Sequence, residues 1–123
     1  MVSGNDSRVL NPVDIEAGIR AAVAEVSTGV NEYTVKLREY REAERLFDLA
    51  WARAYMSKEG PVEQRKQHAV IATEHEKMAM DVAEVAFKYV DRRLRAAEST
   101  LSAYQTLSKS VMAMYGAAGR GEY

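Results

Sequence analysis

Between Val30 and Ser57, apolar side chains recur at alternating spacings of four and three residues. These positions, of which only Glu44 is polar, are Tyr33, Leu37, Tyr40, Glu44, Phe47, Trp51 and Ala54. Heptad spacing places such side chains on one stripe of a helix, where they pack against a second helix. The pattern therefore predicts an amphipathic helix over residues 30–58.

A second and longer apolar series follows Pro61 and meets no Gly or Pro before Gly116. Its members recur at intervals of three, four or seven residues, which fit a repeat of about 3.5 residues. They are Val62, Ala69, Ala72, Ala79, Val82, Ala86, Val90, Leu94, Ala97, Leu101, Tyr104, Leu107, Val111 and Met114. Before this series stands Glu59-Gly60-Pro61, in which Gly suits the end of one helix and Pro the first turn of the next. The sequence therefore predicts a turn at 59–61 and a helix over 61–116.

A shorter helix is expected near the N-terminus. Asn11 offers an N-cap, Pro12 suits the first helical position, and Asp14 puts an acid in the first turn. The apolar residues that follow indicate a helix over residues 12–27. Ser27-Thr28-Gly29 would end or bend this helix, so the sequence leaves open whether it continues into 30–58.

The predicted helices differ in length, and two arrangements solve the mismatch. At 1.5 Å per residue the segment 61–116 would be about 84 Å long, and 30–58 only about 43 Å. Residues 12–58 could form one arm of about 70 Å against 61–116. Otherwise the last helix breaks near Glu98-Ser99-Thr100 and the pieces form a compact bundle. Because no strong helix breaker interrupts the long segment, we expect the first arrangement.

We therefore expect an all-α protein, a long antiparallel helical hairpin of the coiled-coil kind with a short N-terminal helix. Residues 12–116 would form its single domain, between flexible ends at 1–11 and 117–123. Each arm of such a hairpin has only one neighbour, so apolar side chains outside the seam stay uncovered. Because small hairpins of this kind bury the remainder by self-association, we expect a homo-oligomer.

Composition narrows the classes of protein further. Of the 123 residues, 19 are Ala and none is Cys, so a disulfide framework and thiolate chemistry are excluded. The N-terminal residues lack the apolar core of a secretory signal, and no apolar run reaches the length of a membrane span. We expect a protein of the cytoplasm with no membrane partner, or of the host cytoplasm if a phage encodes the chain.

Residues that could carry catalysis are sparse. His68 and His75 lie seven residues apart, which is not the three- or four-residue spacing of a helical metal site. The glycines sit at turns and near the C-terminus, so the chain has no glycine-rich phosphate loop. We expect no catalytic residue, no metal, no cofactor and no enzymatic activity.

The charge is balanced in total but uneven along the chain. With 17 Lys and Arg against 18 Asp and Glu, the net charge is −1, but residues 36–66 carry eight basic and six acidic groups. The candidate nucleic-acid-binding residues near the turn are Arg53, Tyr55, Lys58, Arg65 and Lys66. Cations there would contact phosphates and Tyr55 would stack on a base. The alternative is a solvated helix surface with local ion pairs such as Arg38 with Glu42.

Two stretches resemble the UvsY-type recombination mediators and similar helical-hairpin proteins that tailed phages encode beside their recombination genes. The first stretch is Ala52-Arg53-Ala54-Tyr55-Met56-Ser57-Lys58, which precedes the glycine turn. The second closes the long Ala-rich helix as Leu107-Ser108-Lys109-Ser110-Val111-Met112-Ala113-Met114. The resemblance covers residues 45–117, and it departs from the family at Trp51, where a basic residue is expected, and at the acidic Glu59 of the turn.

The resemblance implies a homo-oligomeric, mostly helical protein that binds single-stranded DNA. Such mediators help a RecA-like recombinase to displace single-strand binding protein and to load onto DNA. Arg53 and Lys58 correspond to the basic stretch of the family. The short C-terminal segment used in oligomerisation corresponds here to Leu107, Val111, Met112 and Met114.

Two functions from different classes are therefore expected. One is a phage-type recombination mediator that binds single-stranded DNA and a recombinase or single-strand binding protein. The other is a helical adaptor or structural protein, for virion assembly or host takeover, that binds only protein. The basic turn and the hairpin pattern favour the mediator, whereas the nearly neutral charge favours the adaptor.

Overall fold

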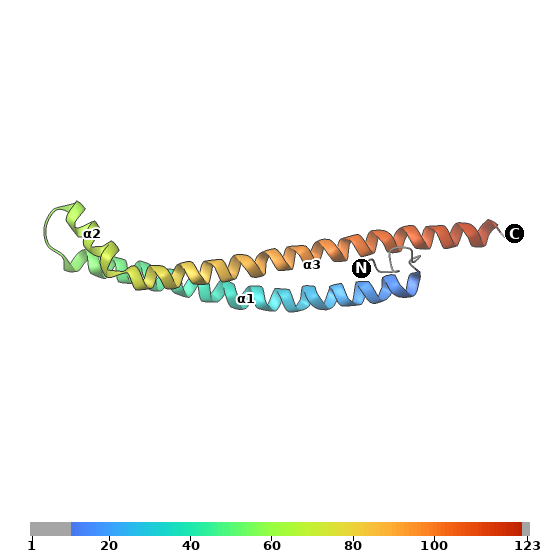
Figure 1. Ribbon diagram of the computed structural model, residues 1–123, viewed down its shortest axis with the longest axis horizontal. Coiled ribbons are helices and arrows are strands. Elements are labelled where there is room, and N and C mark those ends of the chain that lie inside the picture. Colours follow the sequence, from blue (N-terminus) through green and yellow to red (C-terminus); the bar gives the residue numbers. More distant parts are fainter. Residues whose placement is uncertain (1–10, 122–123) are drawn as a thin grey trace, which may run out of the picture. The chain divides into compact units, whose positions relative to one another are not determined.

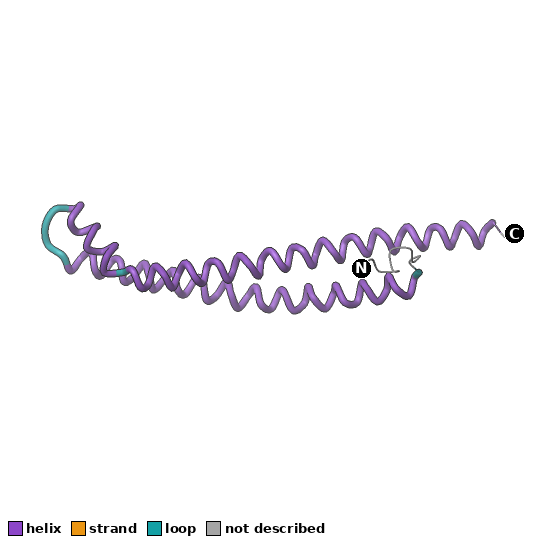
Figure 2. Tube along the Cα trace, viewed as in Figure 1, coloured by secondary structure: helices purple, strands orange, loops and turns teal. Residues whose placement is uncertain are grey.

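The structure, a computed structural model, describes residues 11–121, with side chains as far as residue 117. These residues form three helices, α1 (Pro12–Ser57), α2 (Val62–Ala72) and α3 (Glu74–Gly121), labelled in Figure 1. Figure 2 shows the loop between α1 and α2 in teal. No strand occurs in this part of the chain, so the expected all-α class is confirmed.

The start of α1 is the one that the sequence predicts. The backbone N–H of Asp14 donates to Asn11 Oδ1 at 3.0 Å, and that of Ile15 donates to the Asn11 carbonyl at 3.1 Å. These bonds satisfy N–H groups that have no partner inside the helix. The helix then passes through Ser27-Thr28-Gly29 without a break, which settles the question that the sequence left open.

The predicted single helix over 61–116 is wrong at both ends and at one internal position. Pro61 caps α2 rather than beginning it, and α3 continues to Gly121. The interruption lies at Thr73, not near Glu98-Ser99-Thr100. Both the Thr73 N–H (3.1 Å) and its hydroxyl (2.7 Å) donate to the Ala69 carbonyl, and its backbone leaves the helical region at φ −111°, ψ 18°. A β-branched side chain that bonds the preceding turn bends a helix in this way.

Contacts divide the chain into two units, one of residues 11–28 with 94–121 and one of residues 29–93. In the second unit, an aromatic seam joins α1 to α3. The Phe87 ring lies edge-on to Tyr33 at 5.1 Å and is stacked near Tyr40 at 6.0 Å, centroid to centroid. All seven heptad positions of α1, from Tyr33 to Ala54, are half-buried. The predicted seam is therefore confirmed.

The order of the contacts in this unit gives the helix directions. Arg93 pairs with Glu32, Phe87 packs on Tyr33, and the Lys77 ammonium lies 5.9 Å from the Phe47 ring. Residue numbers rise along α1 as they fall along α3, so the two helices run antiparallel. The hairpin packing expected from the sequence is thus present in this unit.

The first unit packs through small side chains. Ile15 and Ala22 of α1 and Ala97 of α3 are its buried residues among those described. Gly18 of α1 lies under the Tyr104 ring of α3, so closely that an added Cβ would overlap the ring. A glycine inside a helix costs stability relative to alanine, and here that cost allows the aromatic ring to sit against the backbone.

The expected flexible N-terminal end, apart from residue 11, lies outside the described residues, as do residues 122 and 123. Across the described chain the fully buried side chains are few, and three of the five apolar ones are alanines. No helix in this part of the chain combines the length and the apolar character needed to cross a membrane.

We predict that Gly18→Ala lowers the free energy of unfolding by about 1–3 kcal/mol, because the new methyl group forces the Tyr104 ring out of place. Thermal or urea unfolding followed by circular dichroism measures the change. In a Tyr104→Ala background the same substitution should instead stabilise the protein, since the obstructing ring is gone.

Gly116→Ala is the matched control, because an added Cβ there meets no atom within 4 Å. It should raise the free energy of unfolding by up to about 1 kcal/mol, the usual difference between Gly and Ala in a helix. If Gly18→Ala stabilised the protein as Gly116→Ala does, the packing of Tyr104 on Gly18 would be contradicted.

Candidate nucleic-acid interface

The candidate residues near the turn all belong to the unit of residues 29–93. Helix α1 ends at Ser57, whose hydroxyl donates to the Ala54 carbonyl at 2.8 Å. Lys58 and Glu59 follow, and then Gly60 with φ 115°, a backbone conformation that side chains other than Gly rarely adopt. Pro61 precedes the first residue of α2. The predicted turn is confirmed, with Gly60 at its sharpest point.

An aromatic–cation stack holds α2 against the end of α1. The Trp51 and Tyr55 rings are stacked at 5.3 Å with 11° between their planes, and the Arg65 guanidinium lies 4.3 Å from the Tyr55 ring centroid. Arg65 Nε also donates to the Tyr55 carbonyl at 3.3 Å. A guanidinium over an aromatic ring contributes roughly 0.5–1 kcal/mol at exposed sites and more when desolvated. Tyr55 and Arg65 therefore serve the packing of the hairpin end.

The other three candidate cations, Arg53, Lys58 and Lys66, are exposed. Lys58 lines a shallow depression of about 470 Å³ with Glu63, Gln64, Gln67 and His68. Lys66 lies 3.9 Å from Glu63, a long contact between exposed side chains. Exposed pairs of this kind contribute little and rearrange easily. Arg53, Lys58 and Lys66 can therefore turn towards an incoming anion.

The net charge of the hairpin end is positive, whereas the net charge of the whole chain is slightly negative. Residues 51–66 contain Arg53, Lys58, Arg65 and Lys66 against Glu59 and Glu63, a local excess of two positive charges on a chain of net charge −1. The structure brings the five predicted residues into one end of one unit. It assigns Tyr55 and Arg65 to the stack, and it leaves Arg53, Lys58 and Lys66 accessible.

The predicted oligomerisation residues lie in the last part of α3, in the other unit. Leu107, Met112 and Met114 are 39%, 67% and 68% exposed, whereas Val111 is half-buried. Met114 lies on the same side of the helix as Leu107, whereas Met112, two residues before Met114, lies on another side. Exposed methionines suit an adaptable contact with another protein surface. Three of the four residues are thus available for such a contact.

Four members of the predicted inward series, Ala79, Val82, Leu107 and Met114, are exposed on α3. Val82 was expected in the inward series, but it is 66% exposed, as are its neighbours along the helix, Met78, Val85 and Tyr89, to similar degrees. Val82 and these three neighbours follow one another at spacings of four, three and four. The four residues form a second heptad pattern on another side of α3. When all apolar positions of the helix are taken as one series, the two patterns merge and cannot be told apart.

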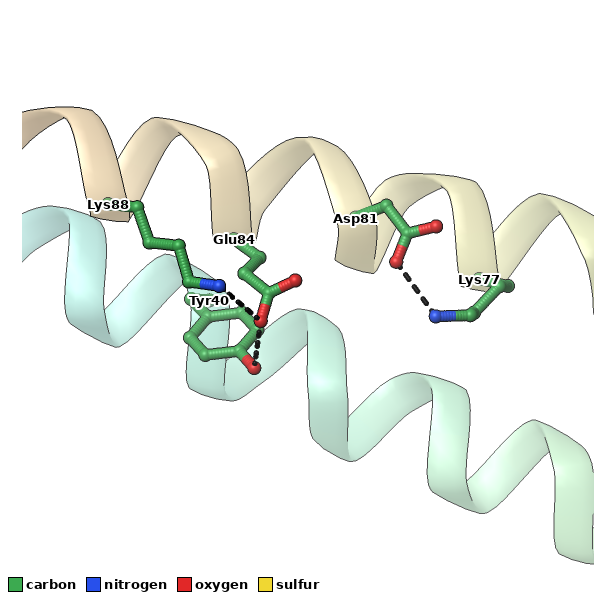
Figure 3. Close-up of polar contacts among 5 residues, drawn as sticks. All are labelled: Tyr40, Lys77, Asp81, Glu84 and Lys88. Carbon is green, nitrogen blue, oxygen red and sulfur yellow. Dashed lines mark hydrogen bonds and ion pairs between the residues drawn. The ribbon is translucent and has the colours of Figure 1, made fainter.

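A cluster of polar side chains lies between α1 and α3 and along α3. Figure 3 shows Tyr40 of α1 donating to Glu84 Oε2 of α3 at 3.2 Å, with Lys88 Nζ 3.5 Å from the same carboxylate. One turn earlier, Lys77 Nζ donates to Asp81 at 2.8 Å. Partial burial and the bond to Glu84 raise the pKa of Tyr40, and the bond to Asp81 raises the pKa of Lys77. These shifts stabilise the protonated forms, so the cluster holds helices together and activates no nucleophile.

Among the residues that the structure describes, no three His, Cys, Asp or Glu side chains lie close enough together to hold a metal ion. His68 is half-buried beside the depression at the hairpin end, and His75 is exposed at the start of α3.

Comparisons of the chain with protein-family models, with curated protein sequences and with solved structures found no match in any of the three.

We predict that Tyr55→Ala shifts the fluorescence emission of Trp51 to longer wavelength and lowers the melting temperature. The reason is that Trp51, the one tryptophan of the chain, loses its stacking partner and gains contact with water. Tyr115→Ala, at an exposed position of α3, serves as the control and should leave the emission unchanged. Equal spectra for Tyr55→Ala and the wild type would contradict the stack.

A second prediction concerns alkaline pH. A tyrosine whose pKa is raised by folding contributes stability that is present below its unfolded pKa, about 10, and is lost as pH rises through the folded value. The advantage in melting temperature of the wild type over Tyr40→Phe should therefore be constant between pH 7 and 9 and decrease above pH 10. Thermal unfolding of both proteins across this range measures it. Parallel profiles would show that the bond to Glu84 does not form.

Proposed function

We propose that this chain is a non-enzymatic accessory protein of DNA recombination, which binds single-stranded DNA as a homo-oligomer and assists a RecA-like recombinase. The observation that carries the proposal is the set of accessible cations at the hairpin end, Arg53, Lys58 and Lys66, on a chain whose total charge is nearly zero. The resemblance of the segments around Arg53 and Val111 to the UvsY-type mediators supports the same function.

The binding would be electrostatic and independent of sequence. Exposed lysine and arginine side chains near the turn can follow the phosphates of a single strand without reading its bases. Each hairpin end offers only a few contacts, so a single copy would bind weakly. Several copies joined in one assembly raise the effective concentration of the remaining ends once one has bound. Self-association is thus a functional requirement of this proposal.

The contribution of aromatic residues is proposed to be indirect. Tyr55 is engaged by Trp51 and Arg65, so a base that stacked on it would have to displace one of these partners. The stack instead fixes where α2 leaves the turn, and with it the positions of Lys58 and Lys66. We propose that the three exposed cations contact DNA and that Tyr55 and Arg65 position them.

Joining of the copies is proposed to involve the C-terminal part of α3, where Leu107, Met112 and Met114 are exposed. A recombinase or single-strand binding protein would be the second protein partner, in the cytoplasm of the cell or of the phage's host. A direct test is whether the protein accelerates assembly of a RecA-like recombinase on single strands already coated with single-strand binding protein.

The alternative proposal is a helical adaptor that binds only protein. It is favoured by the exposed apolar side chains on α1 and α3, which exceed in number the buried ones among the described residues. The two proposals differ in their response to an oligonucleotide. Absence of binding at low salt, with the oligomer intact, would leave the adaptor as the function.

We predict that Arg53→Gln together with Lys58→Gln weakens binding of a labelled single-stranded oligonucleotide. For single strands the slope of log affinity against log salt is about −0.7 per phosphate contact, so loss of two contacts should make it shallower by about 1.4. Fluorescence anisotropy at several salt concentrations measures both affinity and slope. Circular dichroism and light scattering of the double variant should show the same helicity and mass as those of the wild type.

Arg20→Gln with Lys109→Gln is the control of equal charge change, because both residues are exposed and lie in the other unit. It should keep the affinity and the slope of the wild type. If both pairs weaken binding equally, net charge and not the hairpin end governs it. If the Arg53 and Lys58 pair binds as the wild type does, the proposed DNA site is wrong.

A further inference from the structure

The outer face of α3 carries an apolar stripe that no described residue of this chain covers. Met78, Val82, Val85 and Tyr89 are 60%, 66%, 69% and 61% exposed, within the unit of residues 29–93. Their spacings of four, three and four place them on one line along the helix, which is the pattern of a helix that packs against another helix. The inner seam through Phe87 and Val90 already contacts α1, so this stripe is a second, separate surface.

The order of residues in the stripe indicates what covers it. If a second α3 runs antiparallel so that Val82 meets the Val85 of that copy, then Met78 meets its Tyr89, and the same two pairs recur on the other side of the axis. Every apolar residue of the stripe is thereby matched with another. A contact in which residue i meets j and j meets i is that of a two-fold symmetric dimer.

The charged side chains that flank the stripe fit the same two-fold symmetry. Asp81 and Lys88 flank the stripe on one side, seven residues apart, and in the antiparallel pairing each lies beside the opposite charge of the second copy. Their present partners are Lys77 (2.8 Å) and Glu84 (3.5 Å) in α3 itself. The Lys77–Asp81 pair is exposed and rearranges at little cost, and when the exposed Lys88 turns away Glu84 keeps its bond with the Tyr40 hydroxyl. In the sequence the same spacing continues to Glu74 before Asp81 and to Arg95 after Lys88, which gives two acids followed by two bases.

The other edge of the stripe has small residues at the corresponding positions, Ala79 and Ala86. The antiparallel pairing sets Ala79 against the Ala86 of the second copy, so nothing on this edge prevents close approach of the two helices. A parallel pairing would gain no ion pair, because it sets Asp81 beside Ala86 and Lys88 beside Arg93. The charges therefore select the antiparallel direction.

We propose that two copies of this chain associate through an antiparallel, two-fold symmetric contact between their α3 helices, centred between Val82 and Val85. The contact does not depend on DNA binding and is distinct from the C-terminal surface at Leu107, Met112 and Met114. The apolar stripe spans about 17 Å of helix, which is short for a stable interface. The dimer therefore dissociates on dilution within the range of ordinary mass measurements.

Charge exchange tests the contact and its symmetry. Asp81→Lys alone and Lys88→Asp alone each set like charges against each other twice per dimer, and each should raise the dissociation constant about tenfold. An equimolar mixture of the two variants restores opposite charges in both pairs of a mixed dimer. Sedimentation equilibrium without DNA should therefore show a lower mass for each variant and recovery of the wild-type mass in the mixture.

This design separates the interface from effects within one helix. Both substitutions also disturb the pairs with Lys77 and Glu84, but mixing two proteins cannot repair a repulsion inside either chain. Two variants that each keep the wild-type mass, or a mixture that stays dissociated, would overturn the proposal. A further variant, Val82→Gln with Val85→Gln, should dissociate the dimer, whereas Val13→Gln with Val23→Gln, at exposed valines of α1, should leave it intact.

Direction is tested by cross-linking, which the absence of native cysteine makes unambiguous. A disulfide needs the two Cα atoms within about 7 Å. Val82→Cys mixed with Val85→Cys should give a mixed disulfide dimer faster than either variant alone. If Val82→Cys alone cross-links fastest, the helices are parallel and the proposed contact is wrong.

Discussion

The structure depends on one geometric constraint: each long helix has a single long neighbour, so it can bury only one narrow stripe. In the unit of residues 29–93 this stripe is filled by the aromatic seam of Tyr33, Tyr40 and Phe87. In the other unit it is filled by Ile15, Ala22 and Ala97, with the Tyr104 ring against Gly18. Alanine and glycine fit here because a thin contact gains more from close approach of the helices than from side-chain bulk. The buried alanines Ala22 and Ala97 thus follow from the architecture.

The same constraint explains how the hairpin end is built. Helix α2 is short and has few side chains to bury, with Ala69 its one buried residue, so it needs a specific contact to hold it. The Arg65 guanidinium over Tyr55, with Tyr55 on Trp51, provides that contact. One of the four cations of this region is thereby used in folding, and the remaining three stay accessible. A count of charges treats these four cations alike, whereas the structure distinguishes Arg65, which contacts Tyr55, from the three exposed cations.

Much of this fold could be predicted from local sequence signals, because those signals are chemically strong. The Asn11 cap, the Gly60 turn and the heptad seam each rest on a few residues with distinctive geometry, and all were found. The bend at Thr73 was missed because no Gly or Pro marks it. It arises from a hydroxyl that bonds the Ala69 carbonyl, which any Thr in a helix could do. At Gly29 the sequence left the continuity of the helix open, because a single glycine weakens a helix without necessarily ending it; in the structure α1 passes through this residue. The role of Arg65 could not be foreseen, because Tyr55 lies ten residues away across the turn.

The two apolar stripes of α3 have different consequences for assembly. The inner stripe is covered within the chain, whereas the outer one is exposed, and its spacings of four, three and four read the same from either end, as an antiparallel second copy requires. A two-fold contact of this kind closes after two copies and cannot by itself build a larger oligomer. Avidity for a long single strand requires more hairpin ends than one such dimer holds. In the proposed assembly a second surface joins dimers to each other, and the candidates for it are the exposed Leu107, Met112 and Met114 on a different part of α3. The proposed assembly on single-stranded DNA thus needs both surfaces, one to form the dimer and one to join dimers.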